Sequence, residues 1–143
     1  GEKLGNFPTV FLVREKTREE VFLALRQGRM YACRSGNNFQ RFVLKDFSVF
    51  DPNTNNQADM GETIELKNKP EIRISVSSAD QKAHNVDVRI VRSGKLIRTI
   101  SKTTPFVVDF KDDYFNPGEL IYYRLDIPGK LVSNPIFVKF RRE

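Results

Sequence analysis

A single histidine limits the acid–base and metal chemistry that this chain of 143 residues can support. His84 lies between two strand-like runs, with Asp80 and Asp87 nearby in the sequence. A loop histidine can titrate near neutral pH or bind a metal. However, a catalytic zinc site usually takes three protein ligands, and no G-x-S-x-G turn nominates a serine nucleophile. We therefore expect His84 to be a solvent-exposed loop residue, and we predict no catalytic residue, no metal ligand and no cofactor.

Three aspartates near residue 110 form the other group whose spacing invites a chemical interpretation. Asp109, Asp112 and Asp113 flank Lys111 and precede Tyr114. Paired carboxylates can share a proton or hold calcium. Because these aspartates lack the D-x-D-x-D-G spacing of a calcium loop, the sequence favours a polar turn here.

The net charge of +6 raises the question of an anionic partner. Lysine and arginine are scattered, apart from the adjacent pair Arg141-Arg142 and a basic region near the N-terminus. No RNA-binding signature of interleaved glycines and aromatics is present, so we do not expect nucleic acid as the partner. The basic region is either a solvated surface or a patch for a polyanion or a neighbouring domain. Its residues are Arg14, Lys16, Arg18, Arg26 and Arg29.

Three aromatic residues stand in turn-like segments instead of strand-like runs: Phe39, Tyr114 and Phe115. Sheet-rich binding domains often hold sugars through exposed aromatic side chains. The alternative to a purely structural role is therefore a module that binds carbohydrate or a cell-surface polymer.

One helix is expected before these segments. Thr17 and Glu20 form a capping box, in which each side chain satisfies a free amide of the first helical turn. Gly28 is a natural end, because glycine enters the left-handed conformation without penalty. The pattern predicts a helix over about residues 18–27.

From Gly28 onward the apolar period changes from helical to alternating. The clearest example is the run at residues 72–76, where isoleucine and valine alternate with arginine and serine. About eight such runs follow one another, with turn signals every 8–12 residues, which is typical of a β-sandwich. We therefore predict a mainly β fold, an antiparallel immunoglobulin-like β-sandwich preceded by one short α-helix.

Tyr122 and Tyr123 bear on the immunoglobulin-like assignment. Both follow the turn at Pro117-Gly118 and enter a late strand. In such sandwiches a tyrosine at this place ties its hydroxyl to upstream backbone, which is called a tyrosine corner. The other interpretation is two strand tyrosines, one buried and one exposed.

The length suits one domain, and a chain of this size can bury a stable core without disulfides or metal ions. Cys33 is the only cysteine, so the chain cannot form an internal disulfide, which is compatible with the cytosol and does not exclude export. No run approaches the roughly 20 apolar residues of a membrane span. The chain begins at Gly1-Glu2 without methionine, so we expect it to be part of a longer polypeptide.

Four short motifs occur in a recognisable order. They are A-L-R-Q-G-R-M-Y-A at residues 24–32, M-G-E at 60–62, Y-Y-R-L at 122–125 and S-N-P-I-F-V at 133–138. This order resembles the C-terminal part of the PHP (polymerase and histidinol phosphatase) superfamily of predicted metal-dependent phosphoesterases. There a final helix leaves the catalytic barrel and a β-sandwich follows. The resemblance covers the chain from about Phe7 to Val138.

The resemblance implies a division of the chain into residues 1–34, the end of a catalytic domain with its linker, and 35–143, the β-sandwich domain. It also implies a function, a non-catalytic accessory domain that supports an upstream catalytic domain or presents substrate to it. The histidines and acids that bind metal in that superfamily belong to the barrel, and none can be carried over. The helix face with Val21 and Leu25 would pack on the missing domain or the sandwich, or form a homodimer.

Overall fold

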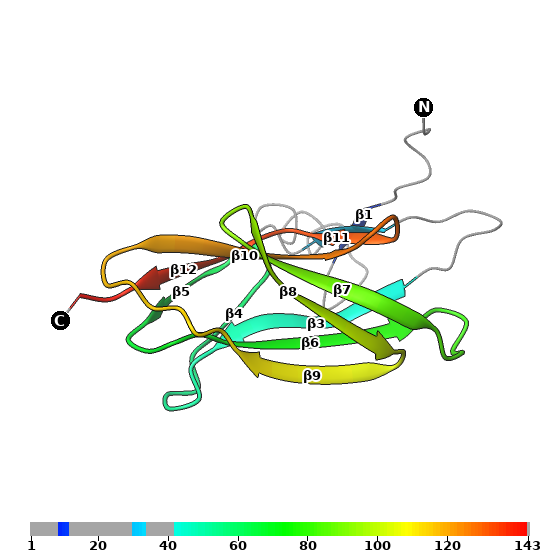
Figure 1. The fold of residues 1–143 in the computed structure, drawn as a ribbon, viewed down its shortest axis with the longest axis horizontal. Coiled ribbons are helices and arrows are strands. Elements are labelled where there is room, and N and C mark those ends of the chain that lie inside the picture. Colours follow the sequence, from blue (N-terminus) through cyan, green and yellow to red (C-terminus); the bar gives the residue numbers. More distant parts are fainter. Residues whose placement is uncertain (1–8, 12–29, 34–41, 143) are drawn as a thin grey trace.

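The computed structural model describes residues 9–11, 30–33 and 42–142, and the regular elements in these ranges are strands (Figure 1). The mainly β prediction is thereby confirmed, whereas the helix predicted over residues 18–27 lies outside the described residues. No helix among the described residues is long and apolar enough to cross a membrane. The strands are β1 (Thr9–Phe11), β2 (Met30–Cys33), β3 (Phe42–Phe50), β4 (Gln57–Asp59), β5 (Thr63–Leu66), β6 (Glu71–Ser78), β7 (Asn85–Arg92), β8 (Lys95–Thr103), β9 (Phe106–Lys111), β10 (Leu120–Ile127), β11 (Leu131–Ser133) and β12 (Ile136–Phe140).

Two sheets make up the fold. The larger sheet has the order β1-β2-β11-β10-β12-β5, and β7 and β8 extend it from the other side of β10. The smaller sheet has the order β4-β3-β6-β9 and forms the lower layer in Figure 1. Buried side chains from both sheets belong to one hydrophobic cluster, so the sheets pack face to face around a shared core.

The alternating runs of the sequence account for the core. In β6 the residues Ile72, Ile74 and Val76 are buried, and their neighbours in the strand are half-buried. Strand β10 follows the same rule and buries Tyr123 and Leu125. A side chain that points inward at every second residue needs a second sheet to cover it, which is why the two layers stack.

Strand β3 departs from strict alternation for a physical reason. Its pairing with β6 shifts between Leu44 and Asp46, where one extra residue bulges out. The inward positions therefore change from Phe42 and Leu44 to Phe47 and Val49.

One pairing departs from the antiparallel arrangement that the sequence predicts. Strands β5 and β12 run parallel, with Leu66 opposite Phe140. Residues 30–33 form the short strand β2, which pairs with β11 in the larger sheet. The division of the chain at residue 34 stays a prediction.

Candidate functional site

The parallel pairing of β5 and β12 brings basic residues together at one end of the sandwich. Because Leu66 lies opposite Phe140, the residues that follow them, Lys67 and Arg141, leave the sheet side by side. The Arg141 amide donates a hydrogen bond to the Leu66 carbonyl at 2.9 Å, which continues the pairing past the strand ends. Arg142 comes next, so three cations from two distant parts of the sequence meet here.

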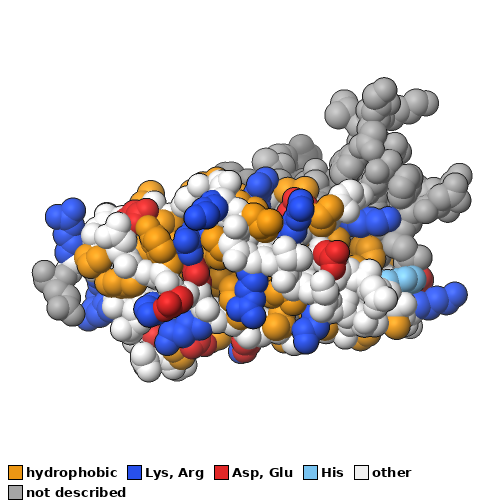
Figure 2. All heavy atoms as spheres, in the orientation of Figure 1, with side chains coloured by type: hydrophobic (Ala, Val, Ile, Leu, Met, Phe, Trp, Pro, Cys, Tyr) orange, Lys and Arg blue, Asp and Glu red, His pale blue; other side chains and the backbone are white. Residues whose placement is uncertain are grey.

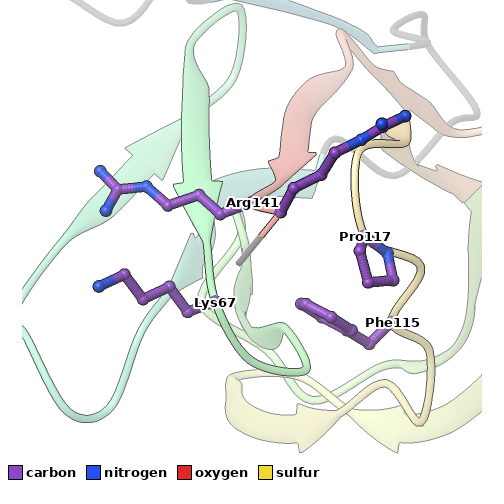
Figure 3. A pocket seen from close by; sticks show the side chains of 5 residues that line it. Lys67, Phe115, Pro117 and Arg141 are labelled. Atoms are coloured by element: carbon purple, nitrogen blue, oxygen red, sulfur yellow. The ribbon is translucent and has the colours of Figure 1, made fainter.

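A pocket of about 580 Å³ opens at this end, lined by Lys67, Phe115, Pro117, Arg141 and Arg142. Figure 3 shows Lys67 and Arg141 extending in the same direction from one wall, with Phe115 and Pro117 on the other side. Phe115 and Pro117 come from the connection between β9 and β10. The pocket therefore has a basic wall and an apolar wall.

The charges of the basic wall are only partly compensated. Arg141 Nε lies 3.0 Å from Glu65 Oε2, and both side chains are about half exposed. Such an exposed ion pair orients the arginine more than it stabilises the fold. Within the described residues Lys67 and Arg142 have no acidic side chain within ion-pair distance. These two cations are available to a negatively charged ligand.

Arg142 is placed by the turn that contains Gly118. Gly118 has a φ of +83°, which favours glycine, and a Cβ at this position would collide with the Arg142 guanidinium group. The Gly118 amide donates to the Phe140 carbonyl at 2.8 Å, so the turn is fastened to β12. The absence of a side chain at residue 118 thus leaves the space that Arg142 occupies.

The apolar wall is held by aromatic packing. The ring of Phe115 packs on Phe140, with ring centres 4.9 Å apart. Both the ring and the hydroxyl of the adjacent Tyr114 have partners. The Arg92 guanidinium lies 4.0 Å from the centre of the ring, and the hydroxyl donates a hydrogen bond to Glu119 at 2.5 Å. That hydrogen bond raises the pKa of Tyr114 above its usual value. Phe115, and not Tyr114, faces the pocket.

Behind this wall lies a buried polar cluster. Arg92 Nη1 donates to both carboxylate oxygens of Asp112, at 2.9 and 2.7 Å. The Tyr123 hydroxyl donates to the same carboxylate at 2.5 Å, and burial raises the pKa of Tyr123 far above its ordinary value, with the Asp112 hydrogen bond adding to the effect. The Asp112 amide also donates to the Pro70 carbonyl at 3.0 Å. The cluster therefore anchors the start of the connection that carries Phe115 and Pro117.

Two further hollows adjoin the pocket. One, of about 340 Å³, is lined by Glu65, Gly118, Lys139, Phe140, Arg141 and Arg142. The other, of about 460 Å³, is lined by Pro52, Asn53, Lys67, Asn68, Lys69, Lys111 and Phe115. We call the six cations that line the three hollows the basic end: Lys67, Lys69, Lys111, Lys139, Arg141 and Arg142. Figure 2 shows Lys and Arg side chains scattered over the visible face, with some of them at the end of the molecule at which the described chain finishes.

Several residues singled out from the sequence lie outside the described residues. These are the basic region Arg14, Lys16, Arg18, Arg26 and Arg29 and the aromatic Phe39. Phe115 does line a pocket, together with Arg141 and Arg142, the adjacent basic pair of the sequence. Sequence reasoning missed Lys67, because only the parallel pairing of β5 with β12 brings it to Arg141.

The two strand tyrosines have different surroundings. The hydroxyl of buried Tyr123 reaches a side chain, Asp112, eleven residues upstream, where a tyrosine corner would use a backbone group. Tyr122 is half-buried on the outer face of the sheet, with its ring centre 6.4 Å from that of Phe137.

Two polar residues are less exposed than the sequence suggests. Asp112, which the sequence places in a polar turn, is buried and paired with Arg92. His84 is not a freely exposed loop residue: its side chain is 23% exposed, and its Nε2 lies 2.8 Å from Asp80 Oδ2. Asp80 also accepts hydrogen bonds from the Ser78 hydroxyl and the Lys82 amide, and these lower its pKa well below the usual value, the Ser78 bond most.

Among the described residues, no three His, Cys, Asp or Glu side chains are grouped so that they could hold a metal ion. What the basic end offers chemically is a set of positive hydrogen-bond donors beside an aromatic wall. No family model matches the sequence, and neither does any curated protein.

Proposed function

We propose that this chain is a non-catalytic accessory domain that binds a phosphate-bearing ligand in the pocket at its basic end. The observation that carries the proposal is the convergence of Lys67, Arg141 and Arg142 on one pocket opposite Phe115. Arginine presents a planar fork of donors that matches a phosphate group, and lysine adds a compact positive charge. Two of the three cations have no acidic partner among the described residues, so a dianion would satisfy them.

The resemblance to the PHP superfamily gives the ligand a context. In that superfamily the substrates are phosphoesters, and the order of the motifs from residue 24 to residue 138 resembles that of the family. A pocket that holds phosphate would let the accessory domain present such a substrate to an upstream catalytic domain of the same polypeptide. The metal-binding groups of the reaction would belong to that domain.

The strand order supports an immunoglobulin-like topology, which we propose as the finer description of the fold. Strands β3, β6 and β9 belong to one sheet, and β7, β8, β10 and β12 belong to the other, and the chain crosses between the sheets after β6, β8 and β9, as in a Greek key. A short strand, β5, runs parallel to the last strand. The buried Tyr123 lies on the strand that follows the connection between the sheets.

Binding of inorganic phosphate and of a phosphomonoester, measured by calorimetry at low salt, tests the proposed function. We expect binding by the 143-residue chain and its loss in Arg142→Glu. Lys102→Glu is the matched control, because Lys102 is an exposed cation on β8 that lines none of the three hollows. Equal affinity in both variants, or no binding by the original chain, would refute the proposal.

The non-catalytic part of the proposal needs a separate assay. Hydrolysis of a phosphomonoester and a phosphodiester is measured with added manganese or zinc. We expect no turnover by this chain alone. Turnover that survives repurification would overturn this part.

The carbohydrate alternative is supported by one observation, the placement of Phe115 in the pocket wall. It predicts binding of a neutral oligosaccharide that Phe115→Ala abolishes and Arg142→Glu leaves unchanged. A phosphate site predicts the opposite order of effects, so the same two variants separate the two functions.

A further inference from the structure

The three hollows at the basic end adjoin one another, and we call the line that runs through them the path. The central pocket shares Lys67 and Phe115 with the hollow beside Lys111, and it shares Arg141 and Arg142 with the hollow beside Lys139. Shared lining residues show that the hollows are neighbours at one end of the sandwich, so a ligand long enough to pass around those side chains reaches more than one of them.

The cations are distributed along the whole path and are not confined to its centre. Lys139 and Arg141 are two residues apart at the end of β12, so their side chains leave the same face about 7 Å apart. Lys67 lies beside Arg141, and Lys69 and Lys111 follow in the outer hollow. Asn53 and Asn68 add neutral amides to that hollow.

The charge of the path exceeds what one phosphate can neutralise. Six cations line the three hollows, and Glu65 is the one acidic side chain among the described residues that line them. Asp113, which lines none of the three hollows, forms an ion pair with Lys69 and also interacts with the positive charge of Lys111. A single phosphate carries about two negative charges. The remaining positive charges repel one another unless a longer anion covers them.

Resting on the proposed function, we propose that the ligand is a linear chain of several consecutive phosphates that lies along the three hollows, with the central pocket holding one of them. The source of such a chain is either condensed inorganic polyphosphate or a phosphodiester polymer. Both present regularly spaced anionic groups to the row of cations.

A chain-length series of inorganic phosphates is the test. Orthophosphate, tripolyphosphate and a polyphosphate of about ten units are titrated into the 143-residue chain at several salt concentrations. We expect affinity to rise with length, and the logarithm of the binding constant for the longest chain to fall with the logarithm of salt with a slope of roughly −3 or steeper, as expected for four or more contacts.

Variants at the two ends of the path separate a long site from a single pocket. Lys139→Gln and Lys111→Gln should each weaken binding of the longest chain several-fold and leave orthophosphate binding unchanged, because neither residue lines the central pocket. Lys102→Gln is the control and should change neither. Melting temperatures of all variants check that each one is folded.

The outcomes distinguish the two proposals. Orthophosphate binding with no gain from chain length, or end variants that behave like Lys102→Gln, would overturn the long site and leave the proposed function standing. Failure of every phosphate to bind would overturn both. A thymidine oligonucleotide of equal charge identifies the source: equal binding supports a phosphodiester chain, and tighter binding of polyphosphate supports the condensed form.

Discussion

Lys67 and Arg141 are 74 positions apart in the sequence and occupy the same place on two parallel strands, one residue past each strand end. The hydrogen bond from the Arg141 amide to the Leu66 carbonyl, 2.9 Å long, holds them in register. Because the backbone pairing fixes where these two side chains begin, two like charges start from adjacent positions, which is the basis of the anion site proposed above.

Removing a positive charge from this pair and replacing its guanidinium group by an ammonium group should change phosphate affinity by different amounts. Lys67→Gln should lower phosphate affinity roughly tenfold, because a hydrogen bond to a charged group is worth about 1.5–3 kcal/mol. Arg141→Lys keeps the charge but removes the planar fork, so we expect a smaller loss. Calorimetric titration with phosphate measures both. The unfolding free energy should stay within about 0.5 kcal/mol of the original, as for exposed side chains in general. A larger loss from Arg141→Lys than from Lys67→Gln would contradict this ranking.

Alanine substitutions at two glycines distinguish the effect of backbone strain on stability from the effect of displacing Arg142 on binding. Gly118 and Gly129 both have positive φ, +83° and +71°, so alanine at either should cost about 1–2 kcal/mol of stability. An alanine at residue 118 also meets the Arg142 guanidinium, whereas nothing lies within 4 Å of the corresponding position at residue 129. Urea unfolding should therefore give similar losses, and only Gly118→Ala should weaken phosphate binding. Equal binding by the two variants would show that Arg142 is not placed by this turn.

The buried cluster predicts different roles for the adjacent tyrosines. Tyr123→Phe removes the hydroxyl that Asp112 accepts from, and we expect a loss of roughly 1–2 kcal/mol in unfolding free energy because Asp112 is buried. Tyr122→Phe is the control, since among the described residues its hydroxyl has no hydrogen-bond partner, and we expect a loss below about 0.5 kcal/mol. Chemical denaturation of both variants tests this, and equal losses would refute it.

The loop between β6 and β7 predicts a pH-dependent contribution to stability from Asp80. Its folded-state pKa is lowered, chiefly by the Ser78 hydroxyl, so the ionised carboxylate stabilises the fold above its unfolded pKa of about 3.9. That contribution disappears as the pH falls through the lower folded value. Asp80→Asn should therefore be less stable than the original chain at pH 7, and the gap should narrow below about pH 4. Urea unfolding at pH 7, 5 and 3 measures the gap; a constant gap would exclude the mechanism.

The sequence predicted those parts of the fold that depend on local pattern. Alternation located β6 and β10 because a strand with one buried face repeats every two residues, as at Ile72 and Ile74. The bulge between Leu44 and Asp46 and the parallel pairing of Leu66 with Phe140 depend on partners far away in sequence, and no local signal encodes them.

The candidate site was predictable to a similar extent. Arg141-Arg142 stood out as an adjacent basic pair, and Phe115 stood out as an aromatic residue in a turn. The pocket that these residues share could not be predicted from the sequence, because Lys67 also lines it and is distant in the sequence. Asp112 looked like a turn residue, because the two groups that compensate its burial, Arg92 and Tyr123, are twenty and eleven positions away in the sequence.

The pairing of β2 with β11 has a practical consequence for fragments of this protein. Leu131, Val132 and Ser133 use one side of their backbone to bond residues 31–33. A polypeptide shortened to start at residue 35 would leave that side of β11 open, and open strand edges recruit other chains. Such a truncated protein should precipitate or self-associate, even though every buried residue of the described range 42–142 would be present.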